Sequence, residues 1–224
     1  MMTWLISLLS VLLIGGHMEY KHIHWMGQSA FRIEDSTMQI YIDPFKLPAH
    51  LPKADVIFIT HAHFDHFSME DIAKIKTEHT IIVAPKDVAM KFGDSALVVV
   101  PGKSYTIGRL KVTTVPAYNL DKKFHPKENN WVGYIITLSS GQKIYHAGDT
   151  DFIPEMRDIM TDIAMLPCGG TYTMTAIQAA EAANSFNPRV LIPMHFGPGL
   201  GTVHAGEEVK KLFKGETIIK TQER

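Results

Sequence analysis

Cysteine is nearly absent from this sequence of 224 residues, in which Cys168 stands alone. A single cysteine excludes an internal disulfide and a zinc site built from several thiolates. Any bound metal must therefore use imidazole and carboxylate ligands. No base stands near Cys168 in the sequence, so we expect this side chain to pack in the core and not to act as a nucleophile.

An excess of charge of either sign is also lacking. The 22 Lys and Arg residues face 23 Asp and Glu residues, which leaves a formal net charge of −1. A protein without a positive field does not attract nucleic acid, so we expect a small-molecule substrate and no nucleic-acid partner. Histidine, by contrast, occurs 12 times, and several histidines stand in tight groups. These groups direct the search for a functional site.

The sequence has no apolar run long enough to cross a membrane. Residues 4–14 are apolar apart from two serines, but a spanning helix needs about 20 apolar residues. The segment also lacks the basic start and the small-residue cleavage site of a secretory signal. Two interpretations stay open for residues 1–17: a leader that acts as a weak signal or anchor, or a non-native start before Met18. We expect a cytoplasmic protein, or an anchored or exported one if the leader is functional.

The rest of the chain, residues 18–224, has the length of one domain in which strands alternate with helices. Runs rich in β-branched and aromatic residues predict strands, and helical periodicity follows Ser68, a plausible N-cap. The predicted strands are 21–25, 30–33, 39–42, 56–60, 80–84, 97–100, 110–115, 134–138, 143–146, 163–166 and 190–193, with Ile218 in a last edge strand. The predicted helices run to about residue 76 and over 174–185 and 205–213. This order predicts two mixed sheets between helices.

The strongest chemical signal is the segment Thr60-His61-Ala62-His63-Phe64-Asp65-His66, which follows an apolar strand and precedes a helix. A strand end and a tight turn can aim alternate side chains into one cavity, and imidazole with carboxylate suits zinc, manganese or iron. The spacing of His61, His63, Asp65 and His66 permits two adjacent metal sites. A solvated histidine-rich loop, or a helix cap by Asp65, fits the buried-strand context less well.

Three further residues end predicted strands and could join this group. Asp149, in Tyr145-His146-Ala147-Gly148-Asp149-Thr150, could bridge two cations and fix their separation, or simply cap the following segment. His195 follows another apolar strand. A lone histidine at such a position is usually structural, but the other ligand-type residues of this sequence favour a metal ligand here. Asp43 could be an outer carboxylate that orients a ligand histidine or a water.

These residues resemble the metallo-β-lactamase superfamily, and within it the branch of metal-dependent hydrolases that looks like ascorbate-phosphate lactonase. The resemblance covers about residues 20–217. It is carried by Trp25-Met26-Gly27, Asp43-Pro44, the segments 60–66 and 146–150, Leu166-Pro167-Cys168-Gly169-Gly170 and Pro193-Met194-His195-Phe196-Gly197. It implies a four-layer αββα sandwich with a dinuclear site at one edge. Proteins of this fold class often form homo-oligomers, so a homo-oligomer is one expected state.

The resemblance also implies a distribution of ligands over two divalent metal ions. His61 and His63 would hold the first ion, Asp65, His66 and His195 the second, and Asp149 would lie between them. Zinc is favoured by these ligands, with manganese or iron as alternatives.

The sequence departs from the family pattern at two places. Asn119 stands where a third histidine of the first site is expected, and an amide oxygen is a weaker zinc ligand than imidazole. His125, six residues further along, could fold back to replace it, or could bind substrate or transfer a proton; both interpretations stay open. Gln28 stands where a histidine often follows the opening glycine, so a polar contact there can differ.

The predicted function is hydrolysis of an ester, lactone or phosphoester in a small substrate by a metal-bound hydroxide. Asp65 would hold the hydroxide, and His125 or His146 would protonate the leaving group. The main alternative is a catalytically degenerate metal-binding protein of the same fold, because Asn119 weakens the first site. By family resemblance, a di-iron oxidoreductase would carry Glu near Phe64 and a nuclease would carry a basic arm, and the sequence has neither.

Residues 120–130 form the one long polar connection, a candidate for a mobile lid or a substrate-contacting segment. Its lysines Lys122, Lys123 and Lys127 could attract a phosphate or carboxylate of the substrate, although a charged loop is more often only solvated.

Overall fold

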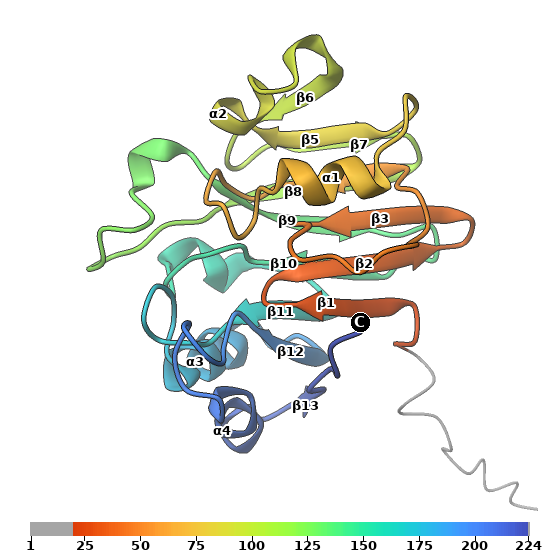
Figure 1. Ribbon diagram of the computed structural model, residues 1–224. Coiled ribbons are helices and arrows are strands. Elements are labelled where there is room, and N and C mark those ends of the chain that lie inside the picture. The colour runs from red at the N-terminus through yellow and green to blue at the C-terminus, as the bar shows by residue number, and fades with distance from the viewer. Residues whose placement is uncertain (1–19, 224) are drawn as a thin grey trace, which may run out of the picture.

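Two β-sheets pack face to face in the computed structural model, which describes residues 20–223 (Figure 1). The predicted leader lies outside the described residues. The first sheet has its strands in chain order: β1 (Ile23–Gly27), β2 (Ala30–Asp35), β3 (Met38–Ile42), β4 (Val56–Phe58), β5 (Ile81–Pro85) and β6 (Ala96–Val99). The second sheet contains β7 (Ser104–Ile107), β8 (Leu110–Pro116), β9 (Val132–Thr137), β10 (Lys143–His146), β11 (Ile163–Pro167), β12 (Val190–Met194) and β13 (Glu216–Thr217), also in chain order.

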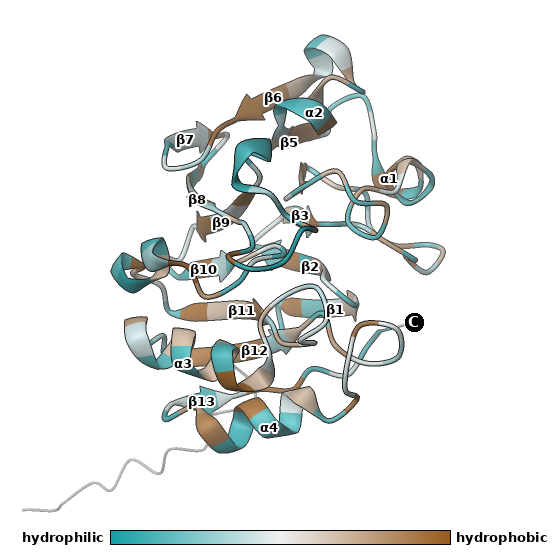
Figure 2. Cartoon of the chain, turned by 90° about the vertical axis from the view of Figure 1, so that its left-hand side faces the viewer, coloured by the Kyte–Doolittle hydropathy of each residue, from teal (hydrophilic) through white to brown (hydrophobic). Residues whose placement is uncertain are grey.

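Helices cover the outer face of each sheet. The first sheet packs against α1 (Met69–Ile75) and α2 (Lys86–Ala89), and the second against α3 (Ala176–Phe186) and α4 (Ala205–Leu212). Figure 2 shows α1 and α3 on opposite outer sides of the two sheets. Three short 3-10 helices, η1 (Gly93–Ser95), η2 (Lys127–Asn129) and η3 (Pro154–Asp158), lie in connections. The predicted four-layer αββα sandwich of two mixed sheets is confirmed.

The strands that run through the middle of the sandwich are apolar on both faces. In β4, Val56 and Phe58 point into the core between the sheets, whereas Ile57 packs on the outer side with Ile72 of α1. Strands covered on both faces read as continuous apolar runs instead of alternating ones, which explains the sequence pattern. The hydroxyl of buried Tyr134 in β9 donates to the carbonyl of Ile59, 2.8 Å away, and so ties the second sheet to the first.

Parallel pairing brings the carboxyl ends of several strands to one edge of the sandwich. In the first sheet β3 pairs in parallel with β4, and β4 with β5. In the second sheet β10, β11 and β12 are parallel, and β8 runs the same way because both it and β10 are antiparallel to β9. Side chains that follow β3, β4, β8, β10 and β12 can therefore meet.

Besides the three short 3-10 helices, one strand and one helix were not predicted, and both are short and weakly patterned. β7 is an edge strand in which Ile107 alone is buried, so it has little apolar signal. α2 has four residues, too few for a helical period. The last strand ends at Thr217, one residue before the predicted Ile218. None of the helices in residues 20–223 has the length and apolar character needed to traverse a bilayer.

Candidate metal centre

The segment from His61 to His66 turns sharply after β4 and leads into α1. The backbone N–H groups of His66 and Phe67 both donate to the carbonyl of His63, at 3.0 and 2.9 Å. Ser68 then caps α1 by accepting from the N–H of Asp71, as the sequence predicted. This turn buries His61 and His66 and leaves His63 and Asp65 half-buried, with all four at one end of the sandwich.

One candidate ligand group consists of His61, His63 and His125, whose ligand atoms lie within 4.8 Å of one another. His61 Nε2 and His63 Nδ1 are 3.2 Å apart. The indole ring of Trp131 packs against the His61 and His63 rings, with centroids 5.0 and 4.9 Å away, and limits their movement. His125, and not Asn119, is therefore the third side chain beside His61 and His63.

Asn119 supports His125 instead of acting as a ligand. Its Oδ1 accepts from the backbone N–H of His125 at 3.0 Å and contacts His125 Nδ1 at 2.9 Å. Its Nδ2 donates to the carbonyl of Tyr172. Because an amide oxygen can only accept, Nδ1 of His125 carries the proton and Nε2 has a free lone pair. His125 therefore folds back toward His61 and His63, while its role as a metal ligand stays a prediction.

The other candidate group consists of Asp65, His66 and His195. Asp65 Oδ2 lies 3.8 Å from His195 Nε2 and 4.0 Å from His66 Nε2. Asp149, which follows β10, lies between the two groups: its oxygens are 3.3 Å from His66 Nε2, 3.3 Å from His125 Nε2 and 3.1 Å from His195 Nε2. All six predicted ligands and His125 are therefore brought together, and Asp149 lies between the two groups.

Asp43 stands behind the ligands and fixes two of them. Its carboxylate accepts from His66 Nδ1 at 2.7 Å, from the backbone N–H of Thr60 at 2.8 Å and from the Thr60 hydroxyl at 2.7 Å. Since the Thr60 hydroxyl gives its proton to Asp43, its oxygen accepts from His61 Nδ1, 2.9 Å away. Both histidines are thereby held with Nε2 as the ligand atom. Asp43 also falls within ligand distance of His61 and His66, but its oxygens are already used, which supports the predicted outer role.

Left-handed backbone aims several of these side chains. Gln28, Asp43 and His195, each just after a strand, have φ angles of 50°, 49° and 52°. Such angles in residues other than glycine cost about 1–3 kcal/mol each and gather at functional sites. Gln28 donates from Nε2 to Asp65 Oδ2. The glutamine that stands where relatives often have a histidine therefore orients Asp65.

Several buried side-chain atoms of this cluster have no hydrogen-bond partner, which is expected of a candidate cation site. His66 Nε2, His125 Nε2, His195 Nε2 and one oxygen of Asp149 have no hydrogen-bond partner, and such groups are costly to bury unless something binds them. Burial would raise the pKa of Asp149, but the His195 and His66 imidazoles hold it well below its usual range. Buried carboxylates facing imidazole nitrogens without hydrogen bonds match the ligand chemistry of divalent metals, so these residues fit a divalent cation.

His146 lies outside this centre. It is fully buried, its Nε2 donates to the carbonyl of Ser29 at 2.9 Å, and its Nδ1 accepts from the N–H of Gly148. Burial lowers its pKa, and both ring nitrogens are used by the backbone. The predicted proton transfer by His146 therefore does not hold, and its role is to tie β10 to the loop after β1.

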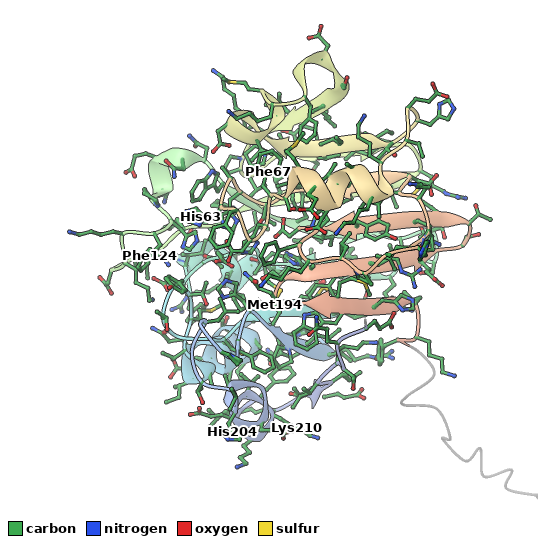
Figure 3. The ribbon with its side chains drawn as sticks, viewed as in Figure 1. His63, Phe67, Phe124, Met194, His204 and Lys210 are labelled. Carbon is green, nitrogen blue, oxygen red and sulfur yellow. The ribbon has the colours of Figure 1, made fainter. Side chains whose placement is uncertain are left out.

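A cavity of about 290 Å³ opens onto the two ligand groups. Five of the candidate ligands line it, namely His63, Asp65, His125, Asp149 and His195, together with Phe64, Phe124, Tyr172, Gly199 and Leu200. Figure 3 shows His63 and Phe124 at this end of the molecule. The predicted substrate-contacting loop supplies Phe124 and His125. Tyr172 and Leu200 were missed, although Tyr172 follows the Gly169-Gly170 turn after β11, a strand end that could have pointed to it.

Cys168 lies next to this turn but has no part in the site. It is buried, and burial raises the pKa of its thiol to about 12. The predicted packing role is confirmed by this environment.

Comparison with known proteins places the chain among metal-dependent hydrolases. The β-lactamase superfamily domain matches residues 22–195. A UPF0173 metal-dependent hydrolase of Methanosphaera stadtmanae is 34% identical over 201 residues, which cover 80% of this chain and 86% of that one. The corresponding protein of Thermococcus onnurineus is 35% identical, with 88% and 95% covered.

Solved structures agree with this placement. A protein of Parabacteroides distasonis described as a metal-dependent hydrolase superposes with a TM-score of 0.81 at 35% identity, covering 90% of this chain and 93% of that one. Igni18, a metallo hydrolase of Ignicoccus hospitalis, gives a TM-score of 0.74 at 25% identity, with 90% and 95% covered.

Proposed function

Since the chain belongs to the β-lactamase superfamily and is a metal-dependent hydrolase, we propose that it holds two divalent cations and hydrolyses an ester, lactone or phosphoester bond of a small substrate. The observation that carries this proposal is the arrangement of two ligand groups around Asp149 at the floor of a cavity. Zinc suits the mixture of imidazole and carboxylate ligands, with manganese and iron as alternatives.

Asp65, Phe64 and Phe124 would have different roles in hydrolysis. Divalent cations, when bound, lower the pKa of water to about 7 and polarise the oxygen that gains charge. Asp65 is half-buried at the cavity wall and held by Gln28; its carboxylate would orient the attacking water, accept a proton from it and pass this proton to the leaving oxygen. Phe64 and Phe124 at the cavity lining would exclude bulk water.

A catalytically degenerate metal-binding protein is the second candidate, raised by Asn119 in place of a histidine. Because His125 approaches the first group and is held there by Asn119, this group has three imidazoles. We therefore favour the hydrolase.

Asp65→Asn tests the assignment. We expect kcat for the best substrate of an ester, lactone and phosphoester screen to fall by at least about 10²-fold, the usual contribution of a positioned acid or base. Asp94→Asn, an exposed carboxyl in η1, serves as the matched control and should leave kcat unchanged. Full activity in a folded, metal-loaded Asp65→Asn variant would refute this role.

A further inference from the structure

The wall of the cavity away from the metal ligands is apolar. Phe64, Phe124, Tyr172 and Leu200 line it. Among the described residues, the charged side chains in the lining belong to the ligand groups, and the lining contains neither lysine nor arginine. A substrate bound here would place its reacting bond at the ligands and the remainder of its structure against aromatic and aliphatic carbon.

Two of these aromatic side chains are largely exposed to solvent. Phe64 has 76% of its surface exposed and Phe124 has 46%. Phe64 is held edge-on by Phe45, with ring centroids 5.9 Å apart, and Phe124 by Tyr172, with centroids 4.8 Å apart. Single exposed apolar side chains are ordinary, but apolar side chains that converge on one cavity are typical of a ligand site. A ligand with an apolar surface would remove both rings from water.

The lysines of the neighbouring loop do not supply a site for an anion. Lys122 pairs with Asp151, and Lys127 lies 3.2 Å from Glu155. Neither they nor Lys123 line the cavity. A phosphate or carboxylate remote from the reacting bond would lose its hydration in this cavity without gaining a cationic partner, which is unfavourable.

We propose, on the basis of the hydrolase function above, that the substrate is a small uncharged ester or lactone whose non-reacting part is an aromatic or branched aliphatic group. The cavity volume of about 290 Å³ lies just below the usual range of about 300–1,000 Å³ for ligand sites, which favours a small substrate. In the reaction, the water oxygen bonds to the acyl carbon, the bond from this carbon to the alkoxy oxygen breaks, and a water proton goes to that oxygen. Phosphorylated and carboxylated esters are poor substrates.

A matched pair of esters tests this specificity on the metal-loaded protein. Para-nitrophenyl butyrate and mono-para-nitrophenyl succinate share a leaving group and differ at the end of the acyl chain, where a carboxylate replaces a methyl group. We expect kcat/KM to be at least about tenfold higher for the butyrate, a difference of ~1.4 kcal/mol. Equal values, or a preference for the succinate, would overturn the proposal while leaving the hydrolase function intact.

Phe124→Lys should reduce this preference at least about fivefold, because it places a cation in the cavity wall. Met160→Lys is the matched control: Met160 is 75% exposed and lies near Lys143 at the amino end of β10, on another surface. It should leave the preference unchanged. An equal change in both variants would contradict the role of the cavity wall.

A pair of ketones that cannot be hydrolysed separates specificity from catalysis. Butyrophenone should bind the metal-loaded protein at least about tenfold more tightly than 3-benzoylpropionate, and Phe124→Lys should remove the difference. If neither ester is hydrolysed but butyrophenone binds preferentially, the specificity stands and the proposed hydrolysis of esters fails. If the carboxylated ketone binds as tightly, the specificity fails.

Discussion

Asn119 is expected to control the first metal position without touching the metal. Asn119→Ala removes the oxygen that accepts from the backbone N–H and the Nδ1 of buried His125, and the amide that donates to Tyr172. Loss of an outer partner of a ligand histidine typically costs 10–100-fold in metal affinity, or about 1.4–2.8 kcal/mol. We therefore expect one of two zinc equivalents to bind about 10–100-fold more weakly, measured by titration against a competing chelator.

A remote asparagine provides the control for this experiment. Asn184 makes the same kinds of hydrogen bond, donating to the carbonyl of Leu212 and accepting from the N–H of Lys214, at the junction of α3 and α4. Asn184→Ala should lower stability without changing zinc affinity, and Asn119→Asp, which keeps an acceptor oxygen, should restore most of the lost affinity. Two unchanged zinc affinities in a folded Asn119→Ala variant would refute the positioning role.

Two further predictions concern stability. Burial would raise the pKa of Asp71, but the ammonium of Lys74 and two backbone N–H groups hold this pKa below its usual value. The ionised carboxylate therefore stabilises the folded protein. This stabilisation is complete above the unfolded-state pKa of about 3.9 and is lost as the pH falls through the lower folded-state pKa. Asp71→Asn should cost about 1–3 kcal/mol at pH 7 and flatten the acid limb of a urea-denaturation series, whereas an unaltered acid limb would contradict this. Gly148→Ala would introduce a side chain at a φ of 64° and 3.0 Å from Thr60 Cβ, whereas Gly102→Ala has a φ of 71° and open space. Gly148→Ala should therefore lower stability by more than the ~1 kcal/mol expected for Gly102→Ala. Equal losses of stability in thermal unfolding would show that the contact with Thr60 costs nothing.

The fold and most of the candidate ligands could be predicted because their signals are local. The segment from His61 to His66 brings four ligand-type residues together in the sequence itself, and Asp149 and His195 each follow an apolar strand. Parallel strands then bring their carboxyl ends to one edge, a consequence of the element order.

Other features of the site depend on contacts between distant segments. The opposite roles of His125 and His146 are set by Asn119 for one and by Ser29 and Gly148 for the other, and no spacing encodes these partners. The apolar cavity wall likewise joins Phe64 to Leu200 across the two halves of the chain. The periodicity of apolar residues in helices and strands cannot predict this cavity wall, because the side chains that form it come from loops.

If the side chains around Asp149 hold two divalent cations, as proposed, the metal content per chain shows it most directly. Protein saturated with zinc or manganese and then freed of excess metal should contain two ions per chain by elemental analysis. His125→Ala should retain about one, while His79→Ala, at an exposed histidine, should retain two. One ion or fewer in the folded, saturated wild-type protein would contradict the account.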